Sequence, residues 1–207
     1  MSKEEVYNKM GYIAQVMEES VYEGLNNPKP GQIINARAGR YLNDSKNQRL
    51  IPLGVMDTAI AWSMAVVEVN SRYGRIVAAP TGGACGVTPG AILGVAEHLC
   101  LSKEDRTKAL LAAGIVGLFI AEHATFAAEI CGCQAECGAA SAMAAAGVVQ
   151  LYVGTPKQCA AAASIALQNV LGMVCDSVAD LVEVPCLGRN VLGTINAISC
   201  AIWQWPA

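Results

Sequence analysis

The chain has 207 residues, of which 54% are hydrophobic, 5% aromatic and 15% charged, with a formal net charge of −3. This length suits one domain with its own core, and without a basic tract we expect no nucleic-acid ligand. Gly, Glu and His interrupt the apolar runs, which argues against a membrane span, and the opening MSKEEVYNKM has no secretory pattern. We expect a cytoplasmic protein whose nine cysteines bind metal or lie buried rather than form disulfides.

The N-terminal part predicts one long helix followed by a polar arm. Apolar residues recur at three- and four-residue steps over 1–25, and Ser2 with Glu5 can form a capping box. Residues 26–31, NNPKPG, end this helix because two prolines and a glycine cannot continue it. Residues 32–53 are the most polar part of the chain and are expected to form a loop or arm.

The remainder predicts a series of helices with almost no strand pattern. They are expected over 55–72, from Thr88-Pro89 onwards, over 103–121 with a cap by Ser102 and Asp105, over 134–152, over 156–172, and after Arg189-Asn190. We therefore expect an all-α fold: a single Ala-rich helical domain, 1–207, with buried glycine-rich loops. It would comprise an N-terminal helix and arm, 1–50, and a core, 51–207, that contains the candidate functional residues.

Eight of the nine cysteines fall into two groups. Those among apolar neighbours are expected to fill the core: Cys100, Cys159 and Cys200. Others lie at irregular points beside Gly, Asp or Pro, where a loop can present sulfur to a cavity: Cys85, Cys131, Cys133, Cys175 and Cys186. No C-x2-C pair typical of zinc is present, and the C-x-C-x3-C of 131–137 matches no common ferredoxin spacing. Spacing alone leaves the role of these thiols open.

Four longer motifs are more specific. GRIVAAPTGGACGVTPG, GCQAECGAASAMAAAG, GMVCDSVADLVEVPCLGRN and LGTINA follow one another within residues 55–200. In order and spacing they resemble the alpha chain, or alpha domain, of the iron–sulfur-dependent L-serine dehydratases. The resemblance implies a [4Fe–4S] cluster whose ligands, and metal-binding residues, are Cys133, Cys175 and Cys186. The local set Cys131, Cys133 and Cys137 is the competing assignment.

The resemblance also implies a reaction. A cubane with three cysteine ligands leaves one iron open as a Lewis acid for the substrate hydroxyl, and a base removes the Cα proton. L-serine, or a similar small β-substituted amino acid, would yield pyruvate and ammonia. None of the seven lysines lies in a glycine-lined motif suited to pyridoxal phosphate, and the turn at 82–90 lacks the lysine of a P-loop.

Supporting site residues follow from the same motifs. Thr81, Gly82 and Gly83 can offer a hydroxyl and backbone N–H groups to a substrate carboxylate, or simply form a tight turn. Gln134 and Glu136 directly follow the first cluster cysteine. They can hydrogen-bond the cluster or the substrate ammonium, or lie on a helix surface.

The sequence departs from the family pattern close to the expected site. Where the family reads Asn-Ala-Ser-x-Ser-Gly-Ala-Glu, residues 123–130 are HATFAAEI, and Ser177 replaces a proline. His123 is a candidate base, fourth iron ligand or neutral core imidazole, and Arg189 pairs a carboxylate or caps a helix. Such changes can alter substrate choice.

The family's β chain carries a Ser-Ser-His-Thr motif that this sequence lacks. We expect a separate serine dehydratase β subunit, further copies of the chain, or both, to cover part of its apolar surface. The alternative functions are a cluster- or metal-binding sensor without turnover, and a zinc-stabilised helical domain.

Overall fold

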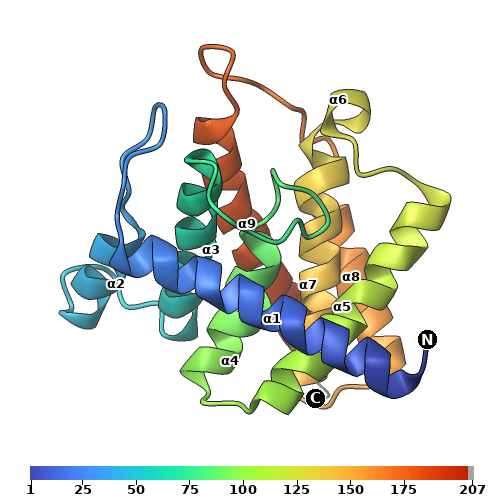
Figure 1. The fold of residues 1–207 in the computed structure, drawn as a ribbon. Helices are drawn as coiled ribbons and strands as arrows, with labels where there is room; N and C mark the ends of the chain where they lie inside the picture. Colours follow the sequence, from blue (N-terminus) through green and yellow to red (C-terminus); the bar gives the residue numbers. More distant parts are fainter. Residues whose placement is uncertain (205–207) are drawn as a thin grey trace.

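The computed structural model describes residues 1–204 and confirms the all-α prediction: within that range only one isolated bridge, between Val178 and Leu181, is not helix, turn or loop. Two of the segments, η1 and η2, are single π-helical turns. In chain order the elements are α1 (Lys3–Asn26), α2 (Ala38–Lys46), α3 (Val55–Ser71), η1 (Pro89–Leu93), α4 (Gly94–His98), α5 (Lys103–His123), α6 (Ala128–Cys131), η2 (Gln134–Gly138), α7 (Ala139–Leu151), α8 (Pro156–Gln168) and α9 (Glu183–Ile202) (Figure 1).

Three of the longer helices begin where short sequence signals predicted. Ser2, Ser102 and Thr155 each accept a hydrogen bond from the backbone N–H three residues later, and the side chain at that later position bonds back to the cap backbone. Each capping box thus satisfies two N–H groups that an unprotected helix start leaves without partners.

The expected arm, 32–53, is partly helical, which corrects the prediction of a loop. It contains α2, whose start is held by Glu68 of α3: one carboxylate oxygen accepts from the backbone N–H groups of Arg37 and Ala38, at 2.6 and 3.0 Å. The residue that caps this helix lies some thirty positions further along the chain, so no local sequence signal marked the start.

The last helix also begins earlier than expected. α9 starts at Glu183 rather than after Arg189-Asn190, so both of these residues lie inside it. The Glu183 carboxylate accepts hydrogen bonds from the backbone of the N-terminal arm, at Gln32, Ile33 and Ile34. This long-range contact stabilises the first turn of α9.

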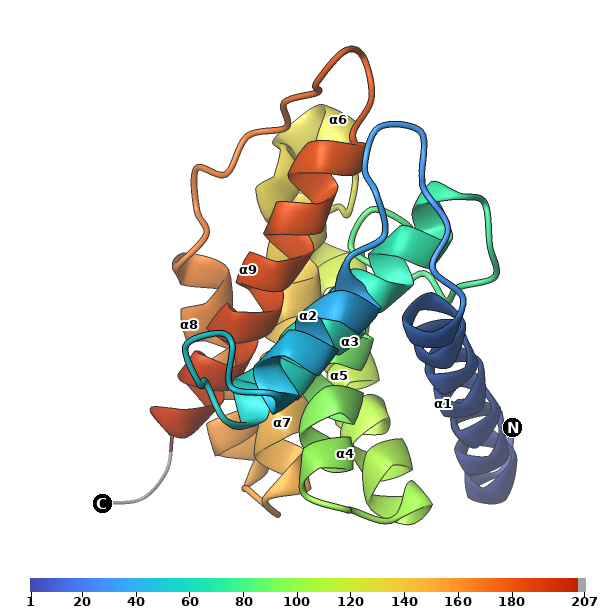
Figure 2. The same cartoon turned by 90° about the vertical axis from the view of Figure 1, so that its left-hand side faces the viewer.

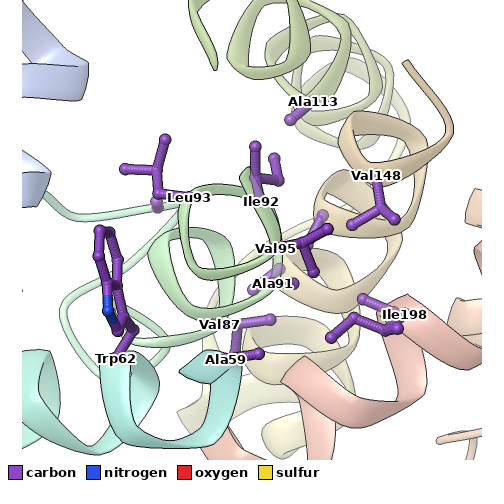
Figure 3. Packing of buried hydrophobic residues seen from close by; sticks show 14 of the residues in the cluster. Ala59, Trp62, Val87, Ala91, Ile92, Leu93, Val95, Ala113, Val148 and Ile198 are labelled. Carbon is purple, nitrogen blue, oxygen red and sulfur yellow. The ribbon is translucent and has the colours of Figure 1, made fainter. Parts of the chain in front are cut away.

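Helices α5, α8 and α9 pack around α7, while α1 lies across α3 and α5 (Figure 1). Most of the core is one large cluster, beside a small second cluster between α7 and α8, and Figure 3 shows Val95 of α4 pointing toward Val148 of α7 and Ile198 of α9. Small residues let the backbones approach closely. On α1, a Cβ added at Gly24 would lie 2.4 Å from the carbonyl oxygen of Ala65 in α3.

One end of the molecule carries most of the irregular chain. The arm after α1, the glycine-rich loop after α3, α6, and the segment 169–182 before α9 lie together at the top of both views (Figures 1 and 2). This end contains the residues that the motifs singled out. Among the described residues, no helix combines the length and hydropathy needed to cross a membrane.

Candidate functional site

The three expected ligand cysteines come from separate segments of this end. Cys133 is the N-cap of η2 and only 1% exposed, and Cys186 lies in the first turn of α9 at 8% exposed. Cys175 lies in the exposed segment before α9. Cys133, Cys175 and Cys186 interact electrostatically with one another. The fold thus brings together thiols from positions 133, 175 and 186.

A glycine makes the close approach of the first two segments possible. Gly132 has a φ of 74°, and a Cβ there would lie 2.7 Å from the carbonyl oxygen of Met173. Gln134 joins the same segments, since its backbone N–H donates to Met173 at 2.9 Å and its side-chain oxygen accepts from Gly172 at 2.8 Å. Gln134 therefore positions the segment that carries Cys175.

Arg189 links the thiols to each other. Its guanidinium donates to the Sγ of Cys133 at 3.2 Å and forms an ion pair with Asp176, directly after Cys175. The prediction that Arg189 pairs a carboxylate or caps a helix is resolved in favour of the carboxylate, because the residue lies inside α9. It stands three residues after Cys186, so it connects all three cysteine segments.

The glycine-rich turn faces Glu136. Thr81 donates its hydroxyl hydrogen bond to the Glu136 carboxylate, and a Cβ at Gly83 would lie 2.6 Å from both carboxylate oxygens. The carbonyl of Gly82 accepts from the Asn70 side chain at 2.9 Å. The turn expected to receive a substrate carboxylate thus holds a carboxylate of the chain itself, and Glu136 is not merely on a helix surface.

The two buried thiols, Cys133 and Cys186, are held in their neutral form in the free chain. Burial raises the pKa of Cys133 to about 11 and Cys175 adds to the rise, while Arg189 opposes it. Burial likewise raises the pKa of Cys186 to about 12, with further contributions from Glu136 and the other two thiols. Deprotonation of these residues therefore requires a positive charge greater than that of Arg189 alone.

Two further buried cysteines adjoin this group. Cys85 in the glycine-rich turn and Cys137 in η2 are each 1% exposed and interact electrostatically with Cys186 and Glu136. Burial raises the pKa of Cys85 to about 12 and also raises that of Cys137. Cys131 is exposed, as is Cys175, so the expected and the competing ligand sets each contain two buried cysteines and one exposed cysteine.

The remaining sequence predictions concern His123 and the three cysteines expected in the core. His123 is exposed at the end of α5, where its Nδ1 lies 3.0 Å from the carbonyl oxygen of Phe119 and its ring stacks on that residue. A core imidazole is therefore wrong, and its catalytic role stays a prediction. Of the expected core cysteines, Cys200 is buried and Cys159 partly so, but Cys100 is exposed.

The candidate metal donors of this site are thiols. Among residues 1–204, no three His, Cys, Asp or Glu side chains are grouped closely enough to hold a metal ion. A [4Fe–4S] cluster would be held by cysteine thiolates, each of which would bind a different iron. Cys133 and Cys186, with Cys175 in the neighbouring segment and Arg189 beside Cys133, supply the donor type that an iron–sulfur cluster needs.

One residue of the site carried no sequence assignment. Asn190 is fully buried and bonds both the glycine-rich turn and the first turn of α9. A signal did exist in its place directly after Arg189 in a family motif, but its partners in the turn lie more than a hundred residues away.

Comparison with known proteins gives a consistent result. The family profile described as "Serine dehydratase alpha chain" matches residues 1–204. A Bacillus subtilis (strain 168) protein described as "Probable L-serine dehydratase, alpha chain" is 39% identical, over 97% of this chain and 67% of that protein. An "L-serine dehydratase, alpha chain" of Peptoniphilus asaccharolyticus is 37% identical, with 97% and 69% covered.

A longer relative shows the same similarity. "L-serine dehydratase 1" of Escherichia coli (strain K12) is 36% identical over 97% of this chain but only 46% of its own length. The chain thus spans about two thirds of the first two relatives and under half of the third. With a match along residues 1–204, this chain belongs to the serine dehydratase alpha chain family.

Proposed function

We propose that this chain is the cluster-bearing part of an L-serine dehydratase, with a [4Fe–4S] cluster held by Cys133, Cys175 and Cys186. The observation that carries the proposal is the convergence of these thiols from three segments, tied together by Arg189. The dehydratase names of relatives at 36–39% identity support the reaction class. The predicted cytoplasmic location stays a prediction.

The chain's own groups supply binding and orientation. When bound, a cluster with three cysteine ligands supplies an open iron, a Lewis acid that assists departure of a hydroxyl group. Glu136 is anchored by Thr81 and packed on Gly83, beside the cysteines. Its carboxylate is suited to accept hydrogen bonds from the substrate ammonium. Backbone N–H groups of Gly82 and Gly83 remain our candidates for the substrate carboxylate.

A partner completes the enzyme in this proposal. The matched relatives are longer than this chain, and two of them are named as alpha chains. Apolar side chains of the cysteine end are exposed by 45% or more, a feature typical of surfaces covered in an assembly: Ile130, Leu171, Val174, Val178 and Val182. We assign this end to contact with a β subunit, a fused domain or a second copy of the chain.

The direct test is an absorption spectrum of the anaerobically purified protein. A brown, oxygen-labile chain with absorbance near roughly 400 nm is expected for the wild type, and Cys133→Ala, Cys175→Ala and Cys186→Ala should each lose it. Cys131→Ala and Cys200→Ala are matched controls that should keep it. A colourless wild type, or colour that persists in all three ligand variants, contradicts the assignment.

Substrate addition separates the two function classes. For a dehydratase, L-serine shifts the spectrum and, with the partner chain present, pyruvate forms. The changed residues 123–130 favour the alternative, a cluster-binding sensor without turnover. That alternative is supported if the protein is brown but its absorption spectrum does not change when L-serine is added, and if no pyruvate forms when the partner chain is present.

A further inference from the structure

We propose that Asn190 is a positioning residue. It holds the glycine-rich turn, and Glu136 with it, in a fixed position relative to Cys186. The inference rests on the proposed function for its meaning in catalysis, but the contacts that carry it belong to the free chain. The motif GMVCDSVADLVEVPCLGRN contains this asparagine, but the sequence alone assigned it no role.

The side-chain amide of Asn190 makes three hydrogen bonds, which satisfy both of its N–H groups and its oxygen. Its Oδ1 accepts from the N–H of Gly86 at 2.8 Å, and its Nδ2 donates to the carbonyl oxygens of Gly83 at 2.6 Å and Cys186 at 2.7 Å. The side chain is 0% exposed, so water cannot replace these bonds. The amide orientation is unambiguous, because the flipped form would oppose an oxygen to two carbonyls.

These three bonds connect the two halves of the site. Cys186 is the ligand candidate on α9, whereas Gly83 is the residue against which the Glu136 carboxylate packs. Without Asn190, the carbonyls of Cys186 and Gly83 would each lose a buried hydrogen bond, and the turn could move relative to α9. The distance between the thiol and the carboxylate therefore depends on this amide.

The chain offers built-in reporters for the test. Cys85 lies between the two anchor points of the turn, and Cys186 lies on the helix; both are buried in the native protein. Cys200 lies further along the same helix and bonds Asn196 instead, with an Sγ to Oδ1 distance of 3.5 Å. Because buried thiols react only when their surroundings open, alkylation rates report each site separately.

The experiment compares Asn190→Asp with Asn196→Asp in the cluster-free chain, using iodoacetamide and mass spectrometry. Asn190→Asp keeps the shape but replaces two donors by an oxygen, so alkylation of Cys85 and Cys186 should rise about tenfold while Cys200 is unchanged. Asn196→Asp should show the reverse, since the Asn196 amide donates to Ala166 and Ser141 rather than to the turn. If the alkylation rates of all three thiols rise equally in both variants, the protein has loosened as a whole and the proposal is overturned. The proposal is also overturned if no alkylation rate rises.

A second variant keeps the test decisive if the aspartate prevents folding. In a helix, serine donates to the carbonyl four residues earlier, so Asn190→Ser should restore the bond to Cys186 but not those to the turn. Cys85 should then react faster and Cys186 at nearly the wild-type rate. If Cys85 and Cys186 react at the same rate in Asn190→Ser, the proposal that Asn190 holds the turn against α9 is contradicted.

Activity gives an independent readout. In the assembled enzyme, Asn190→Asp should lower kcat for L-serine about tenfold and change KM by less than about twofold, because it displaces Glu136 and Cys186 relative to each other. Asn196→Asp should leave both constants unchanged. The thiol measurement needs no dehydratase activity, so failure of the proposed function and failure of the positioning role give different results.

Discussion

Glu136 connects the two chemical parts of the site at the scale of single residues. It accepts a hydrogen bond from Thr81 of the glycine-rich turn and interacts with the thiols of Cys186 and Cys133. A carboxylate beside two potential thiolates is unfavourable unless positive charge is added there. A bound substrate ammonium supplies such a charge, which gives this arrangement a functional reason.

Glu136→Gln removes the negative charge while it keeps the shape and the bond from Thr81. We expect kcat/KM for L-serine to fall by roughly a hundredfold, since one charge-assisted hydrogen bond to the substrate is lost. The melting temperature should stay the same, because the hydrogen bond from Thr81 and the packing on Gly83 are kept. Steady-state kinetics and thermal unfolding check both. Glu129→Gln, an exposed position on α6, is the control and should change neither.

At the scale of elements, close packing of small residues decides how α1 sits on α3. Gly24 faces the backbone of Ala65, whereas a Cβ added at Gly11 on the same helix would meet only the hydroxyl oxygen of Thr107, at 3.9 Å. One glycine is thus required by packing, and the other only weakens the helix.

The two glycines give opposite predictions. Gly24→Ala should destabilise the protein by about 1–3 kcal/mol, because its methyl group collides with backbone that cannot move independently. Gly11→Ala should stabilise it by about 0.5–1 kcal/mol through helix propensity. Urea unfolding measures both free energies. A stabilising Gly24→Ala would show that α1 does not pack on α3 as described.

Glu183 ties the N-terminal arm to the start of α9, and this contact responds to pH. Burial raises the pKa of Glu183, but hydrogen bonds from the backbone of Ile33, Ile34 and Gln32 and from Ser71 outweigh it, so the net pKa lies below its ordinary value. A carboxylate with a depressed folded-state pKa stabilises the protein above its unfolded pKa, and this contribution disappears as pH falls through the folded value.

Glu183→Gln should therefore cost about 1–3 kcal/mol of unfolding free energy at neutral pH. The difference from wild type should stay constant down to about pH 4.5 and shrink at lower pH. Chemical unfolding from pH 7 to pH 3 measures this difference. A difference that grows on acidification contradicts the assignment of the bond to the ionised carboxylate.

At the scale of the whole molecule, a tightly packed helical core supports one less regular end, and this end contains the candidate site. Residues 171–180 are mostly exposed and almost without regular structure apart from the single bridge, and the pair between Asp176 and Arg189 ties them to α9. Exposed segments with few buried contacts open before the core does.

Limited digestion with elastase, which cleaves after small apolar residues, should cut first within 171–182 and leave the rest intact. Asp176→Asn should speed this cleavage severalfold, because it removes the charge that Arg189 binds. Asp180→Asn, in the same segment but without an ion pair among residues 1–204, is the control. Mass spectrometry of the fragments identifies the site, and first cleavage within α7 or α9 contradicts the description.

Much of the fold was predictable because its signals are local. The capping boxes at Ser2, Ser102 and Thr155 each need only four consecutive residues, so these helix starts follow from the sequence. The all-α class follows from apolar periodicity, and the family follows from motifs that include Cys133 and Cys175.

What only the tertiary structure decided involves partners far apart in the chain. Glu68 caps α2, Glu183 begins α9 by binding the arm, and Asn190 bonds the turn across more than a hundred positions. A polar residue's local context does not reveal such a partner, because hydrogen bonds form wherever the packed helices bring donor and acceptor together. By itself the sequence determined most of the helices, the family and the cysteines of interest; the tertiary structure decided where α2 and α9 begin and that Arg189, Glu136 and Asn190 meet around the cysteines.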